Sequence, residues 1–113
     1  MSDCLFCKIS SGEIPVDVVL ETDDVMAFRD IDPQAPTHVL VIPRQHFDNV
    51  ADLTREDPEL SARVLGATSE VAQLETLDHG YRVVTNVGSD GGQSVRHVHF
   101  HVLGGRGLTW PPG

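Results

Sequence analysis

The 113-residue sequence contains no apolar run that approaches the roughly 20 residues of a membrane-spanning helix. Its first residues, MSDCLFCK, include an acid and lack the apolar stretch of a secretory signal peptide. These two absences predict a cytoplasmic protein that does not bind a membrane.

Basic residues are scarce, since 8 Lys and Arg against 17 Asp and Glu give a formal net charge of −9. Nucleic acids and anionic membranes both need a basic surface, so we expect neither as a partner. Any phosphate ligand must then be held by local donors rather than by the overall field of the protein. Cysteine is also rare, and in the cytoplasm Cys4 and Cys7 are expected to be reduced or metal-bound rather than joined in a structural disulfide.

The sequence has no internal repeat and no linker long enough to divide it, which predicts a single domain over residues 1–113. Asp57 and Pro58 are suited to the start of a helix, and apolar residues at helical spacing follow them. The pattern predicts a long helix from Pro58 to near Leu77, a short helix over 3–10 capped by Asp3, a helical turn over 44–50, and strands over 18–21, 25–29, 38–43, 81–87 and 95–103. Strands that mostly follow one another predict an α+β fold with an antiparallel sheet.

Three histidines alternate with apolar residues in RHVHFHVLGG. Side chains alternate across a strand, so His97, His99 and His101 are expected on one face and the apolar residues between them on the core face. Three chemical interpretations are open for such a row. The histidines are simply tolerated on an exposed face, they include zinc ligands, or a neutral imidazole acts as a nucleophile.

A glycine-rich loop, GSDGGQS, directly precedes the histidines. Its glycines allow backbone N–H groups to approach an anion closely, and Gln93, Ser94 and Asn86 add neutral donors. A tight turn between two strands is the simpler alternative. Next to the histidines, the loop favours a phosphoryl or nucleotidyl ligand.

The stretch GSDGGQSVRHVHFHVLGGRGLTWPPG resembles the signature of the histidine triad (HIT) superfamily, in particular its histidine triad nucleotide-binding proteins, which are purine nucleoside phosphoramidases. CLFCKISSGEIP and DIDPQAPTHVLVIPRQHF resemble the same branch in order and spacing. The resemblance implies a HIT-like meander, a five-stranded antiparallel sheet with one long and one short helix. It also implies a homodimer in which two chains pair into a continuous sheet.

The resemblance further implies a hydrolase that needs no cofactor for its chemistry. His99 would attack the α-phosphorus of a purine nucleoside phosphoramidate or an aminoacyl-adenylate, and water would then release the nucleoside monophosphate from the nucleotidyl-histidine. His101 and Ser94 would lie beside the phosphate, with Ser94 able to donate to the leaving group. His38 would act as a proton relay or an orienting partner.

For the nucleotide, the resemblance implies that Asp30 accepts from the ribose hydroxyls and that Asn86 and Gly92 hold the phosphate region. Gln93, as a neutral donor of the glycine-rich loop, is a further candidate for binding the nucleotide. An apolar slot for the base would be formed by Leu5, Phe6, Ile9, Phe28 and Ile31, for which ordinary core packing is the alternative. Trp110 would reach toward the partner's site or plug the interface. Two positions depart from the branch: Val87 replaces a common acid, and Arg96 replaces a common aromatic, which leaves the leaving-group preference open.

Cys4 and Cys7 have the CxxC spacing of half a zinc site. In relatives with this pair, the resemblance implies that the other two ligands correspond to His46 and His97, giving a closed structural zinc site. Such a site would attach the N-terminal helix to the sheet and explain His97 without catalysis. Two reduced, packed cysteines are the alternative, and His97 then remains a member of the catalytic network.

Two other functions stay open from the sequence. A dinucleoside polyphosphate hydrolase shares the triad, although the tail GGRGLTWPPG favours the phosphoramidase branch. A zinc-stabilised nucleotide-binding or interaction protein with little turnover is the second alternative, because catalytic residues do not prove a physiological role.

Overall fold

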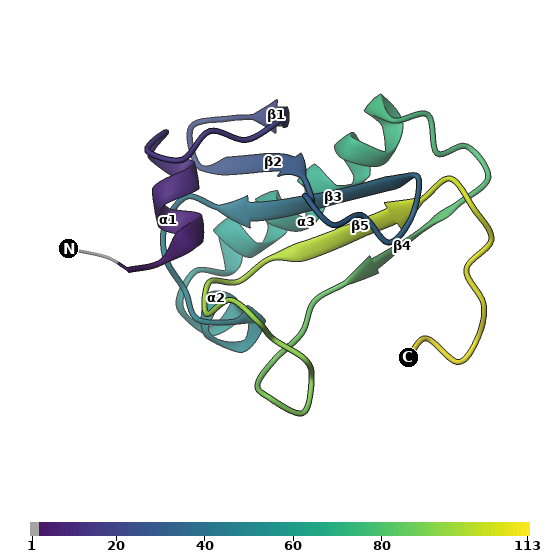
Figure 1. Cartoon of the computed structure of the whole chain (residues 1–113). Helices are drawn as coiled ribbons and strands as arrows, with labels where there is room; N and C mark the ends of the chain where they lie inside the picture. Colours follow the sequence, from purple (N-terminus) through teal and green to yellow (C-terminus); the bar gives the residue numbers. More distant parts are fainter. Residues whose placement is uncertain (1–2) are drawn as a thin grey trace.

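A five-stranded antiparallel sheet forms the centre of the computed structural model, which describes residues 3–113. The strands lie in the order β1-β2-β3-β5-β4 (Figure 1), with bounds Val18–Glu21, Val25–Arg29, Thr37–Pro43, Tyr81–Val84 and Phe100–Gly104 for β1 to β5. The helices are α1 (Leu5–Ser10), α2 (Val50–Glu56) and α3 (Pro58–Leu74). The predicted α+β fold with a five-stranded antiparallel sheet is therefore confirmed.

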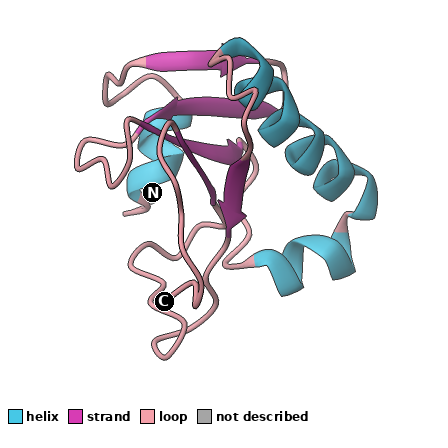
Figure 2. Cartoon of the chain, turned by 90° about the vertical axis from the view of Figure 1, so that its right-hand side faces the viewer, coloured by secondary structure: helices cyan, strands magenta, loops and turns pink. Residues whose placement is uncertain are grey.

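The two faces of the sheet are covered by different helices, as Figure 2 shows with α1 on one side and α2 and α3 on the other. Alternation along β3 produces this arrangement. Val39 and Val41 pack in the cluster of α2 and α3, whereas Leu40 and Ile42 pack in the cluster of α1. All of β3 is buried, so the strand that carries His38 is held from both sides.

The predictions for the short helices are partly wrong. α1 begins at Leu5, and its cap is Cys4 rather than Asp3, because the Cys4 Sγ accepts from the backbone N–H of Cys7. No helical turn forms over residues 44–50; a second short helix, α2, begins at Val50. Its cap is Asn49, whose side chain accepts from the next turn, a signal that the sequence pattern left unused.

The long helix α3 starts as predicted, with the Asp57 side chain accepting from the N–H of Leu60. It ends at Leu74 instead of near Leu77, because Thr76 adopts a left-handed conformation with φ 56°. The N–H groups of Thr76 and Leu77 then bond back to the carbonyls of the last helical turn, at 3.2 and 2.9 Å. Glycine usually occupies this terminating position, so a threonine there gave no stop signal.

The strands that flank the glycine-rich loop are shorter than predicted. β4 ends at Val84 rather than residue 87, and β5 begins at Phe100 rather than residue 95. The segment before β5 is held by other partners, since the N–H of Val98 donates to the Phe47 carbonyl at 2.8 Å. The predicted apolar face is nevertheless confirmed, because Val98, Phe100 and Val102 are all buried in the α3 cluster. Within residues 3–113, no helix is long and apolar enough to cross a membrane.

Candidate active site and metal-binding cluster

A pocket of about 400 Å³ opens between α1 and the sheet, beside two of the three histidines. It brings together many of the predicted nucleotide-binding residues: Leu5, Phe6, Ile9, Phe28, Asp30, Ile31, Ser94, His99 and His101. Phe6, Ile9 and Phe28 also belong to the buried cluster under α1, so the same side chains line the pocket and pack in the core. Leu5 and Ile31 are exposed at 45% and 98%, and form its rim.

Four predicted nucleotide-binding residues do not line this pocket. Gly92 lies in the loop with φ 82°, a conformation that requires glycine, and Asn86 is half-buried in the segment after β4. The Gln93 amide donates to the backbone carbonyls of Asp48 and Val95 at 2.6 and 2.9 Å, which braces the loop. Trp110 is 82% exposed near the C-terminal end.

His99 is buried with one ring nitrogen committed to the backbone. Its Nδ1–H donates to the His97 carbonyl at 2.8 Å, which leaves a lone pair on Nε2 in the neutral ring. Phe6 of α1 packs edge-on against this ring at 5.0 Å between centroids. Burial lowers the pKa of His99, although the bond to the His97 carbonyl and the charge of Asp30 act in the opposite direction. The ring is therefore a neutral base with an available lone pair.

His38 and His101 form a directed hydrogen-bond chain behind the pocket. The backbone N–H of Gln34 donates to His38 Nδ1 at 3.0 Å, so the proton of the neutral His38 ring lies on Nε2. That proton is donated to His101 Nδ1 at 2.9 Å, which places the His101 proton on its own Nε2. Burial, together with His99 and His38, lowers the pKa of His101 to about 4. His101 is thus a neutral donor at physiological pH.

Asp30, His38 and His101 have ligand atoms within 4.8 Å of one another, close enough for a metal ion. The tautomers oppose this use. A metal on His38 Nε2 would move the ring proton to Nδ1, where it would face the N–H of Gln34. Two donors would then point at each other, so this cluster is built to hold protons rather than a cation.

Protonation of His101 is expected to make the fold less stable as the pH falls below about 6.5. In the folded chain the pKa of His101 is about 4, whereas an unperturbed histidine titrates near its model value of 6.5. Between these values the unfolded chain binds more protons, so the free energy of unfolding falls by up to about 1.4 kcal/mol per pH unit for this group. At higher pH the residue is neutral in both states and contributes nothing.

The measurement is urea unfolding of the wild type and a His101→Asn variant at a series of pH values. Asparagine offers an oxygen in place of Nδ1 to accept from His38 but does not titrate. The difference in unfolding free energy between the two proteins should be constant at neutral pH and change below it. A difference that stays constant over the whole acidic range would contradict the prediction.

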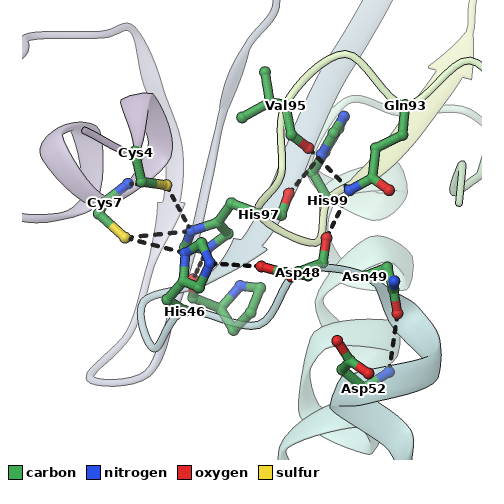
Figure 3. A network of polar contacts seen from close by, with 11 residues as sticks. Cys4, Cys7, His46, Asp48, Asn49, Asp52, Gln93, Val95, His97 and His99 are labelled. Carbon is green, nitrogen blue, oxygen red and sulfur yellow. Dashed lines mark hydrogen bonds and ion pairs between the residues drawn. The ribbon is translucent and has the colours of Figure 1, made fainter. Parts of the chain in front are cut away.

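A second cluster, which we call the metal-binding cluster because its four residues are candidate metal ligands, consists of Cys4, Cys7, His46 and His97, whose ligand atoms lie within 4.8 Å of one another (Figure 3). The His97 Nδ1 lies 3.3 Å from the Sγ of Cys4 and 3.5 Å from that of Cys7. The His46 Nδ1 lies 3.5 Å from the Cys7 Sγ. The cluster thus joins α1 to the segments that follow β3 and precede β5.

The hydrogen bonds of the two imidazoles leave their Nδ1 lone pairs facing the sulfurs. The His97 Nε2–H donates to the Pro43 carbonyl at 2.8 Å, and the His46 Nε2–H donates to the Asp48 carboxylate at 3.0 Å. Metal-bound histidines commonly donate their second ring nitrogen in this way. Burial lowers the pKa of His97 to about 4, so its ring is neutral and suited to a ligand. Two sulfurs and two imidazole nitrogens are a donor set that zinc prefers.

His97 links the metal-binding cluster to the nucleophile candidate. Its ring faces the cysteines, while its carbonyl accepts the Nδ1–H of His99. The side chain of His97 thus belongs to the cluster of candidate metal ligands, while its backbone carbonyl orients the His99 ring.

Sequence reasoning missed two supporting side chains. Thr85 donates its hydroxyl to the His99 carbonyl at 2.8 Å, which holds the backbone beside the nucleophile candidate. Asp48 accepts from His46, and its spacing two residues after a candidate ligand was a usable signal. No sequence signal could have identified the Pro43 carbonyl as the partner of His97, because every residue has a backbone carbonyl.

Comparison with known proteins gives a consistent result over almost the whole chain. The HIT domain family model matches residues 11–108. The sequence is 50% identical over 111 residues to a HIT-like protein of Synechococcus elongatus, covering 98% of this chain and 97% of that protein. It is 48% identical over 115 residues to the 14 kDa zinc-binding protein of Zea mays, covering 99% and 89%.

Solved structures of HIT family proteins are also similar to this chain. A HIT family hydrolase from Legionella pneumophila Philadelphia 1 superposes with a TM-score of 0.94 at 54% identity, covering 98% of this chain and 100% of that one. A histidine triad protein from Clostridium difficile gives 0.91 at 42% identity, covering 96% of each chain. The chain therefore belongs to the HIT domain family, and it is similar to proteins named as hydrolases of that family.

Proposed function

We propose that this protein hydrolyses purine nucleoside phosphoramidates or aminoacyl-adenylates to the nucleoside monophosphate. The observation that carries the proposal is the state of His99, a buried neutral imidazole whose Nδ1–H is bonded to the His97 carbonyl and whose Nε2 lone pair is available at the pocket. A nucleophile needs an available lone pair near neutral pH. The similarity to HIT family hydrolases supports the reaction class.

The pocket has an apolar part and a polar part, as a nucleotide requires. In the proposed complex the base lies against Phe6 and Phe28, and the ribose hydroxyls donate to Asp30. The Asp30 carboxylate already accepts from the N–H of Asp32 at 2.8 Å, which holds it in place. Ser94 and His101 lie beside the phosphate, with Asn86 and Gly92 supplying further donors from the segment between β4 and β5.

The reaction proceeds in two displacements. The His99 Nε2 lone pair forms a bond to the α-phosphorus, and the bond from phosphorus to the leaving atom breaks with its electron pair on that atom. A leaving amine takes a proton from the Ser94 hydroxyl, and the His101 Nε2–H can then donate a proton back to Ser94. A carboxylate leaves as the anion. Water then attacks the phosphorus, and the electron pair of the phosphorus–nitrogen bond returns to His99 Nε2. One proton of the water replaces the proton given to a leaving amine; with a carboxylate leaving group this proton is released to solvent.

Replacing His38 with leucine is expected to lower kcat by about 10²-fold with a smaller effect on KM, because His101 loses the donor that sets its tautomer. A His38→Gln variant should retain more activity. Its amide can still donate to His101 Nδ1 and accept from the Gln34 N–H. Steady-state kcat and KM for both variants provide the check. Equal losses in the two variants would mean that His38 acts through packing alone.

We also propose that the metal-binding cluster holds a structural zinc ion. The ligand atoms, their tautomers and the carbonyl and carboxylate behind the two imidazoles fit zinc, and the Zea mays relative is named a zinc-binding protein. The ion would supply four ligand bonds between α1 and the sheet. It takes no part in the reaction, which is carried by the protein's own side chains.

We propose further that residues 1–113 act as one domain in the cytoplasm, and that two chains pair edge to edge. The edge strand β4 supports this pairing, because its Tyr81 and Val83 side chains are 42% and 38% exposed. In such a homodimer Trp110 reaches the partner's site or covers the interface.

The experiment that tests the function is incubation of the purified protein with adenosine 5′-monophosphoramidate, with release of AMP followed over time. Release at a rate well above the spontaneous one is expected. A parallel incubation with a dinucleoside polyphosphate separates the sister activity. Turnover of the second compound alone would favour the polyphosphate hydrolase, and binding without turnover of either would favour a nucleotide-binding protein.

A further inference from the structure

A second pocket of about 520 Å³ adjoins the nucleotide pocket on the side of the metal-binding cluster. The two pockets share Leu5, Ser94 and Val95, so Ser94 lies on their boundary. In the proposed complex the phosphate lies beside Ser94 and His99. The leaving group attached to this phosphate then extends into the second pocket. The residues that line only the second pocket therefore face the leaving group rather than the nucleoside.

The second pocket contains an arginine that is not engaged elsewhere. Four of the seven arginines in the described chain form ion pairs, and Arg82 and Arg106 donate to backbone carbonyls. Arg96 makes no hydrogen bond or ion pair with residues 3–113 and is exposed at the pocket wall. The pocket also contains two acids, Asp3 and Asp48, and neither forms an ion pair with Arg96; the Asp48 carboxylate accepts from His46 instead. The guanidinium of Arg96 is thus available to an anionic group.

We propose that Arg96 selects leaving groups that carry a carboxylate, namely amino acids joined to the α-phosphorus through their amine nitrogen. This inference rests on the proposed function and decides between the two substrate classes left open there. In an aminoacyl-adenylate the carboxylate is consumed in the anhydride, and the free group is an ammonium that Arg96 repels. In an amine-linked amino acid the carboxylate is free, and the planar guanidinium can hold it with two parallel hydrogen bonds.

The covalent step is that of the proposed reaction. His99 Nε2 bonds to phosphorus, the phosphorus–nitrogen bond breaks with its pair on the amino acid nitrogen, and that nitrogen gains one proton. The free amino acid leaves from the second pocket, and water releases the nucleoside monophosphate from His99. Arg96 exchanges no proton and forms no covalent bond, so it is a specificity residue.

The test compares two substrates that differ only in the carboxylate: AMP linked through nitrogen to alanine, and AMP linked to ethylamine. The wild type should prefer the alanine compound about tenfold in kcat/KM. Arg96→Gln should remove most of this preference, and Arg96→Lys should retain part of it. Arg55→Gln, which removes the same charge on α2 away from both pockets, is the matched control and should keep the full preference.

The failure of this inference can be told from the failure of the proposed function. The role of Arg96 alone would be overturned if the protein turns over adenosine 5′-monophosphoramidate and the ethylamine compound but shows no preference for the alanine compound. A preference for the alanine compound that survives in Arg96→Gln would overturn it as well. Turnover of none of the compounds would overturn the function. The ratio of Kd values for the two compounds, measured by calorimetry in a His99→Ala background, tests Arg96 without turnover; an equal Kd for both would also overturn its role.

Discussion

A His99→Ala variant is expected to lose about 10³-fold or more in kcat/KM for adenosine 5′-monophosphoramidate. The variant lacks the only atom proposed to bond to phosphorus. Donors that remain, such as Ser94 and His101, can still hold the phosphate but cannot form the nucleotidyl intermediate. Nucleotide binding should therefore persist in the variant, within a few-fold of the wild-type Kd.

The wild type should also accumulate a covalent adduct that the variant lacks. Rapid acid quench during turnover, followed by intact-protein mass spectrometry, would detect the mass of one added AMP on the wild-type chain. His79→Ala is the matched control, because His79 is exposed in the turn before β4 and should retain full activity. Residual turnover of His99→Ala within tenfold of the wild type would refute the role of His99 as nucleophile.

Removal of the proposed zinc ion from the metal-binding cluster is expected to lower the free energy of unfolding by about 3 kcal/mol or more. α1 has only six residues, and a helix of this length is not stable alone. Apart from the cluster, it is held to the sheet mainly through the buried side chains of Phe6 and Ile9. Loss of the four ligand bonds should therefore loosen α1 and, with it, the Phe6 side of the base pocket.

The measurement combines elemental analysis with chemical unfolding. The purified protein should contain one zinc per chain, and a chelator or a Cys7→Ser substitution should remove the metal and shift the unfolding midpoint to lower denaturant. The control is Lys8→Ala, which changes the half-buried residue of α1 that directly follows Cys7. This variant should retain zinc. A chain without metal whose stability is insensitive to chelator would support the alternative of two reduced, packed cysteines.

Loss of the proposed zinc ion is also expected to affect catalysis. Because the His97 carbonyl accepts the Nδ1–H of His99, displacement of the His97 ring would disturb the tautomer of the nucleophile. Metal loss should thus lower kcat as well as stability. The effect on kcat should be smaller than that of His99→Ala, since Thr85 still holds the backbone at the His99 carbonyl.

Much of the fold could be predicted because local patterns of apolar residues determine its strands and helices. The alternation of β3 and the helical spacing after Pro58 both produce apolar faces that must be buried, and the structure buries them against each other. Boundaries were harder where tertiary partners replaced local ones. β5 starts late because Val98 bonds to Phe47, and α3 stops early because Thr76 takes a conformation more typical of glycine.

The residue types of the site were readable from the chain alone, since histidines at every second position, a glycine-rich loop and a CxxC pair each limit the chemistry that can occur. Their working states were not readable. The proton on His99 lies on Nδ1 because a backbone carbonyl accepts it, and the proton on His101 lies on Nε2 because Gln34, four residues before His38, sets the direction of the chain. Carbonyl and N–H groups are common to every residue, so only the folded backbone can decide which of them meets an imidazole. The sequence also leaves open which arginines are paired; in the fold six of the seven bond to acids or backbone carbonyls, and Arg96 remains available.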